Sequence, residues 1–99
     1  MTKKTIMITY PMDTVLRQHK PRVAAQMIRD AIDAGLAEGV DAHRASLVYM
    51  AEPANIKRDI YVDDEVLVSV EAISAKTMPT ASKIMVEFLR LYMIEQGVL

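Results

Sequence analysis

Residue types that carry out catalysis are few in this sequence, and none stands at a spacing typical of an active site. The 99 residues contain no cysteine, which excludes thiol catalysis, disulfides and thiolate metal sites together. The two histidines, His19 and His43, have no acidic or histidine partner at metal-ligand spacing, so we interpret them as solvated turn residues. Three glycines are too few for a phosphate-binding loop, and no serine stands in a glycine elbow. The sequence therefore predicts no enzyme and no bound cofactor.

An acidic run at Asp63, Asp64 and Glu65 is the nearest approach to a metal site. It lacks the spacing and the glycine of a calcium loop. Aspartate is favoured at the start of a helix, because its carboxylate accepts hydrogen bonds from the first backbone N–H groups. We therefore interpret the run as a helix cap, and we predict no metal.

Basic and acidic residues nearly balance, with 12 of the first kind and 13 of the second, a net charge of −1 and a pI near 6.1. Nucleic-acid-binding domains usually carry a basic excess. DNA binding therefore requires that basic residues converge on one face, whereas scattered charges would favour a protein partner. The residues that must converge are Lys3, Lys4, Lys20, Arg22, Lys57, Arg58 and Lys83.

The composition indicates one small globular domain with an apolar surplus. Hydrophobic residues make up 52% and charged residues 25%, which is typical of folded chains. The mean hydropathy of +0.12 is high for a domain of this size. Since a small monomer has difficulty hiding so much apolar surface, we expect a homodimer. Without a membrane-length apolar run or a signal peptide, we expect a cytoplasmic location and no membrane contact.

Two segments alternate with the period of two that is typical of strands. Residues 4–10 read KTIMITY and end at Pro11, and residues 57–62 read KRDIYV. Successive side chains of a strand point to opposite faces, so each segment offers one face to a core and the other to solvent. The residues predicted to face the core are Ile6, Ile8, Tyr10, Ile60 and Val62.

Other apolar residues recur at helical spacing. Pro21 suits the first turn of one helix and Gly39 its C-terminal cap. Helices are predicted over 12–19, 21–38, 64–76 and 79–96. The apolar stripes of the three longer helices are Val23, Met27, Ile28, Ala31, Ile32 and Leu36, then Val66, Leu67, Val70 and Ile73, then Ile84, Met85, Phe88, Leu89, Tyr92 and Met93.

Two segments allow more than one interpretation. In 65–72, VLVSV also suits a strand after a hairpin turn at Asp63-Asp64, which would give a compact α+β domain without a paired ribbon. The following EAISAK favours the helix instead. Residues 41–56 are predicted to be a linker or an extra helix, although SLVYM within them also suits a short buried strand.

The order strand, helix, turn, helix occurs twice along the chain. TIMITYPMD matches RDIYVDDE in pattern, and AAQMIRDAIDAGL matches ASKIMVEFLRLYM. The second copy resembles the ribbon–helix–helix (Arc/MetJ-like) superfamily of DNA-binding regulators. The resemblance implies a mainly α fold with a short β ribbon. It implies one unit over 1–40 with a shortened first helix, a linker or extra helix over 41–56, and a second unit over 57–99, in tandem or as a dimer.

The resemblance also implies a function. Proteins of this superfamily are sequence-specific regulators of transcription, many of them repressors of plasmid, phage or antitoxin systems. Their ribbon enters the major groove of double-stranded DNA, and the first turn of the second helix holds a phosphate. By the family's pattern, the residues expected to contact DNA are Lys3, Thr5, Met7, Thr9, Arg22, Lys57, Asp59, Tyr61, Thr80, Ser82 and Lys83.

A protein partner is the alternative. Asp59, Asp63 and Asp64 would repel phosphate, and the apolar stretch over 47–50 would suit contact with another protein. The chain would then be an inhibitor or antitoxin-type module that uses the same scaffold to occlude its partner. A third interpretation leaves the outer strand faces merely solvated, since burial of the inner faces alone explains the alternation.

Overall fold

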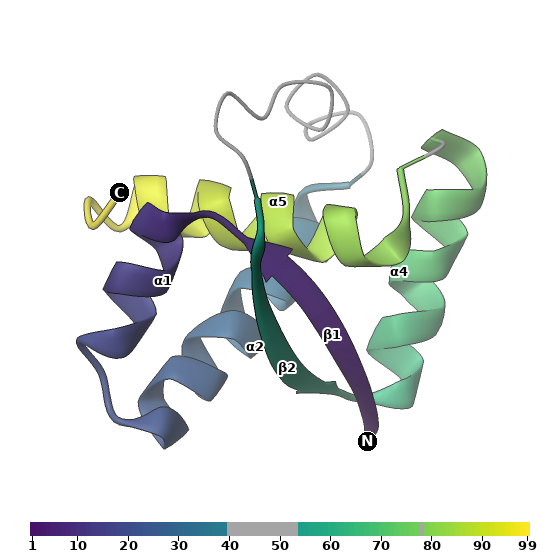
Figure 1. The fold of residues 1–99 in the computed structure, drawn as a ribbon. Coiled ribbons are helices and arrows are strands. Elements are labelled where there is room, and N and C mark those ends of the chain that lie inside the picture. The colour runs from purple at the N-terminus through teal and green to yellow at the C-terminus, as the bar shows by residue number, and fades with distance from the viewer. Residues whose placement is uncertain (40–53, 78) are drawn as a thin grey trace.

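Figure 1 shows the computed structural model, which describes residues 1–39, 54–77 and 79–99. The described residues form a mainly helical domain with one two-stranded antiparallel sheet. The extra helix or strand predicted within 41–53 lies outside the described residues. The elements in chain order are β1 (Thr2–Ile8), α1 (Tyr10–Arg17), α2 (Pro21–Glu38), β2 (Ile56–Val62), α4 (Asp64–Thr77) and α5 (Ala81–Glu95).

The strands β1 and β2 pair with each other, and together they are called the ribbon below. Thr5 lies opposite Asp59 at the centre of the pairing. Both strands have seven residues and the same order of exposed and buried positions. The prediction that one face of each strand enters the core is confirmed for Ile6, Ile8, Ile60 and Val62.

The register gives the ribbon an approximate two-fold axis through the midpoint of the Thr5–Asp59 pair. Each of these residues is the fourth of its seven-residue strand. A half-turn about this axis exchanges Lys3 with Lys57 and Met7 with Tyr61. The helices follow the same order on both sides, but α1 has 8 residues and its counterpart α4 has 14. The shortened first helix predicted for the N-terminal half is therefore present.

Helix α5 is the centre of the core. It packs against α2, α4 and β1, while α2 also contacts β2, so that the inner face of the ribbon is covered by helices (Figure 1). Residues 84–89 are all buried, which a helix achieves only when neighbours surround it. Burial extends to Glu87, whose carboxylate accepts from the Arg90 guanidinium at 2.6 Å, so that the buried charge is compensated.

The strand ends earlier than predicted, and this displaces Tyr10. The hydroxyl of Thr9 accepts a hydrogen bond from the backbone N–H of Met12 at 3.4 Å, so that Thr9 caps α1. Tyr10 is then the first residue of the helix and is 73% exposed, not part of the core. Pro11 fits because a proline at the start of a helix removes no helical hydrogen bond.

The segment after β2 is a helix, so the rival interpretation of 65–72 as a strand is wrong. Leu67, Val70 and Ile73 are buried at helical spacing along α4. The backbone N–H of Leu67 donates to the carbonyl of Asp63 at 2.9 Å, which begins the helix at the acidic run. Among the predicted stripe residues, Val23 alone is exposed, at 48%, and its neighbour Ala24 is buried instead.

Helices α2 and α5 approach each other closely at Gly35. A Cβ atom built on Gly35 would lie 2.3 Å from Cγ of Phe88, far inside van der Waals contact. The Phe88 ring is itself buried. The glycine therefore serves packing, although glycine in mid-helix is otherwise unfavourable.

We predict that Gly35→Ala lowers the free energy of unfolding by about 1–3 kcal/mol, the usual effect of overpacking a core, despite the better helix propensity of alanine. Denaturant unfolding measures this change. If the clash with Phe88 is the cause, Phe88→Leu should be less destabilising in the Gly35→Ala background than in the wild type. Additive effects in this double-mutant cycle would contradict the close packing.

Candidate nucleic-acid interface

The outer face of the ribbon carries six exposed side chains, and no helix covers it among the residues that the structure describes. They come from alternate positions of the two strands, because the inner positions face the helices. Along the ribbon they form three opposed pairs: Met7 with Lys57, Thr5 with Asp59, and Lys3 with Tyr61. All six belong to the residues predicted to contact DNA, and the structure brings them together on one face.

The central pair is tied together by hydrogen bonding. The hydroxyl of Thr5 donates to Oδ1 of Asp59 at 2.7 Å, and Nζ of Lys3 lies 3.6 Å from Oδ2. The hydrogen bond from Thr5, and then the positive charge of Lys3, hold the pKa of Asp59 below its ordinary value. Asp59 is therefore ionised near neutral pH, and its charge is partly compensated within the ribbon.

Thr9 does not join this face. It was expected to read bases as the next outward position of the first strand, but β1 ends at Ile8. The Thr9 side chain is 5% exposed and caps α1. Its place in the predicted set is therefore wrong, because the hydroxyl is already bonded to the backbone and turned into the protein.

The first turn of α5 begins beside the ribbon. The hydroxyl of Ser82 donates to the backbone carbonyl of Thr5 at 3.3 Å, which connects the helix to β1. Thr80 caps the helix by accepting from the backbone N–H of Lys83 at 3.3 Å. The Lys83 side chain is exposed next to these contacts. The structure thus places the predicted residues of this turn near the centre of the ribbon.

The first turn of α2 occupies the equivalent position on the other strand. A hollow of about 210 Å³ separates this end of the helix from the ribbon. Arg22 is exposed in the same turn. The residues that line the hollow are Pro21, Ala25, Ile28 and Arg29 of α2 and Arg58, Asp59, Ile60 and Tyr61 of β2.

Arg58 points inward and meets a buried acid. It stands at an inner position of β2, opposite Ile6. Its guanidinium lies 3.9 Å from the carboxylate of Asp13, which is also paired with Arg17 at 2.7 Å. This cluster was not predicted from the sequence. The alternation of β2 could have indicated it, because a period of two puts Arg58 on the same face as buried Ile60.

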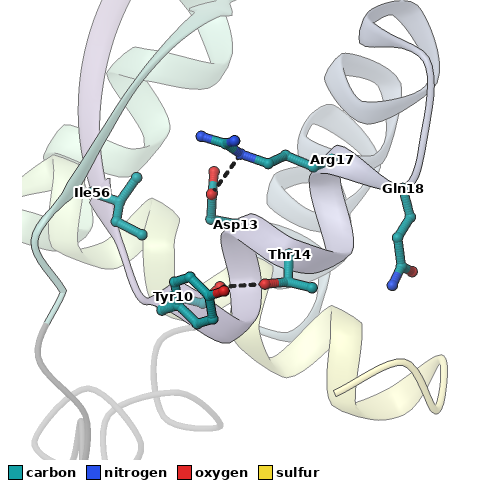
Figure 2. Close-up of a pocket in the computed structure, with 6 residues that line it drawn as sticks. All are labelled: Tyr10, Asp13, Thr14, Arg17, Gln18 and Ile56. Atoms are coloured by element: carbon teal, nitrogen blue, oxygen red, sulfur yellow. Dashed lines mark hydrogen bonds and ion pairs between the residues drawn. The ribbon is translucent and has the colours of Figure 1, made fainter.

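A larger hollow, of about 520 Å³, lies beside α1 (Figure 2). Its buried carboxylate is Asp13, which the figure shows bonded to Arg17. Because the charge of Asp13 is compensated by the protein's own arginines, this hollow carries no functional assignment. Its lining residues are Tyr10, Asp13, Thr14, Arg17, Gln18 and Ile56.

We predict that the carboxyl of Asp59 titrates below its ordinary value near 3.8, as carbon-detected NMR can measure. Thr5→Val should raise this midpoint, because the hydrogen bond from Thr5 is the largest cause of the shift, and Lys3→Met should raise it as well. Since the folded-state pKa is the lower one, the stabilising contribution is present above the unfolded-state pKa. It is lost as the pH falls through the folded-state value. Equal midpoints in wild type and Thr5→Val would contradict the bond.

The described residues contain no group of three or more histidine, cysteine or acidic side chains that could hold a metal ion. Within the same residues, no helix has the length and apolar character to cross a membrane. In comparisons with known proteins, no family model matches the chain, and neither a curated protein nor a solved structure matches it.

Proposed function

We propose that this chain is a sequence-specific DNA-binding regulator of transcription, of the ribbon–helix–helix type, which acts as a repressor. The observation that carries the proposal is the position of the cations. The two strands of the ribbon hold four cations, Lys3, Lys4, Lys57 and Arg58, against one acid, Asp59, a formal charge of +3 in a chain with a net charge of −1. Of these cations, Lys3 and Lys57 stand on the outer face, whereas Arg58 points inward and is paired with Asp13.

The remaining basic residues of the predicted set stand at the starts of α5 and α2. Lys83 follows Ser82, which is bonded to β1, and Arg22 follows Pro21, which faces β2 across the smaller hollow. Lys20 is the cap residue of α2. This arrangement supports DNA rather than a protein partner, because it concentrates positive charge where a polyanion would lie.

A two-stranded ribbon has the dimensions that the major groove accepts. Lysine on the outer face can donate to guanine O6 and N7, threonine can donate or accept, and methionine can contact a thymine methyl group. Tyr61 offers a hydroxyl group, and Asp59 can accept from the amino group of cytosine. These are the roles proposed for Lys3, Thr5, Met7, Lys57, Asp59 and Tyr61.

The two helix starts are proposed to hold the flanking phosphates. The first N–H groups of a helix have no intrahelical partner, and the helix dipole adds partial positive charge there. Lys83 at the start of α5 and Arg22 at the start of α2 would strengthen this anion site. Thr80 and Ser82 would position the α5 turn, since both hydroxyls are engaged by the protein itself.

Two units in one chain are part of the proposal. The ribbon is formed within a single chain, so a second copy is not needed to make it. The homodimer expected from the apolar surplus stays a prediction, and it would place two ribbons side by side on DNA. A regulator of this kind would act in the cytoplasm by blocking transcription.

A protein-binding inhibitor or antitoxin-type module is the second candidate. The observation that favours it is the apolar character of two outward positions: Tyr61 is 57% exposed and Met7 is 36% exposed. Exposed aromatic and methionine side chains are typical of protein interfaces. Under this hypothesis the outer face of the ribbon would bind the partner, and duplex DNA would not compete.

We predict specific binding to the DNA upstream of the chain's own gene, with an affinity that falls steeply as salt is added. Fluorescence anisotropy against this duplex and a scrambled one, at several salt concentrations, tests the proposal. Lys83→Gln should reduce the slope of log affinity against log salt by about one on both duplexes, as for a phosphate contact.

Lys76→Gln is the matched control, because it removes the same charge from the last turn of α4 and should leave the slope unchanged. Absence of binding to either duplex at about 50 mM salt, where phosphate contacts are strong, would contradict DNA as the partner. That result would favour the protein-binding candidate.

A further inference from the structure

The two ends of the ribbon are geometrically equivalent but chemically different. The approximate two-fold axis through the Thr5–Asp59 pair exchanges the Met7–Lys57 end with the Lys3–Tyr61 end. Of the six outer residues, only the two lysines are exchanged with a residue of the same type. Threonine faces aspartate across the axis, and methionine takes the place of tyrosine. A ribbon built from two identical chains would have the same residues at both ends, whereas this chain has a different set at each.

The two lysines also differ in whether their charge is compensated by an acid within the ribbon. Lys3 lies 3.6 Å from the carboxylate of Asp59, so part of its charge is used within the ribbon. Lys57 stands diagonally across from Thr5, which is neutral, and no ion pair of Lys57 is found among the described residues. The Met7–Lys57 end is therefore the more cationic one. The Lys3–Tyr61 end has an aromatic hydroxyl group and a partly compensated lysine.

We propose that the ribbon recognises a DNA element without two-fold symmetry, in a single orientation, and that the unlike pairs Thr5/Asp59 and Met7/Tyr61 set that orientation. The proposal rests on the DNA-binding function inferred above. A lysine reads guanine best and a methionine contacts thymine methyl, so the Met7–Lys57 end should select these bases. At the centre, Asp59 accepts hydrogen bonds only, which favours a cytosine amino group on its side of the axis.

In-vitro selection from a pool of random duplexes, followed by sequencing, tests this proposal. The expected element has no dyad symmetry within the segment bound by one chain, and stoichiometry by analytical ultracentrifugation defines that segment. Two symmetrised duplexes are then made by duplicating each half of the element in inverted orientation. Both should bind about tenfold more weakly than the selected element or worse, a loss typical of even one mismatched base pair.

A symmetrised protein gives the converse test. Asp59→Thr combined with Tyr61→Met leaves lysine, threonine and methionine at both sets of equivalent positions. Both side chains are exposed, so the variant should fold, which its melting temperature checks. It should now select a dyad-symmetric element and prefer the duplex that duplicates the half read by Met7 and Lys57.

The matched control makes the same two changes outside the outer face of the ribbon. Tyr10 on α1 and Asp30 on α2 are exposed, so Tyr10→Met with Asp30→Thr should still select the asymmetric element. A dyad-symmetric element bound by one wild-type chain would overturn the proposal, and so would a symmetrised variant whose element stays asymmetric. Enrichment of no duplex would instead overturn the DNA-binding function on which it rests.

Discussion

The antiparallel pairing of β1 with β2 is the constraint on which the rest of this structure depends. The two strands are separated by residues 9–55, nearly half of the chain, and a two-stranded sheet alone is only marginally stable in water. The pairing persists because its inner face, with Ile6, Ile8, Ile60 and Val62, is covered by α2 and α5. The register of this pairing determines the approximate two-fold axis and the position of both helix starts. It also determines which side chains of the ribbon are exposed on the outer face.

Packing under the ribbon is less symmetric than the ribbon itself. Helix α5 is surrounded, and six successive residues are buried, whereas α2 buries a single stripe. The close approach of Gly35 to Phe88 lets the two helices meet. The short α1 and the longer α4 then complete the two halves in different ways. The core therefore tolerates unequal halves as long as the strands stay paired, which leaves the outer residues free to differ.

Much of the fold follows from local patterns in the sequence, because strand and helix periodicities report burial on one side. The alternation around Ile6 and Ile60 predicted both strands, and Pro21 marked the start of α2. Local patterns do not reveal where a strand ends when one of its next residues can cap a helix instead. Thr9 and Tyr10 continue the alternation of β1, yet the Thr9 hydroxyl bonds to the backbone of Met12 and begins a helix.

Hydrophobic periodicity also cannot predict contacts between residues that are far apart in the sequence. No spacing indicates that Asp13 lies beside Arg58. From the sequence alone, the charge of Asp59 was expected to repel phosphate. Its bond to Thr5, 54 residues away, appears only when the register is known.

Net charge is a poor guide to the partner of so small a chain, because it averages over faces that a ligand never meets. Asp13 and Glu87 count toward the total of −1, but both are buried and paired with arginines. Asp30, which accepts a hydrogen bond from Gln26, belongs to α2 and not to the ribbon. On the outer face of the ribbon, an approaching polyanion would meet Lys3, Lys57 and Asp59, whose charge is already shared with Lys3. The field that guides association is local, so strand register rather than composition determines it.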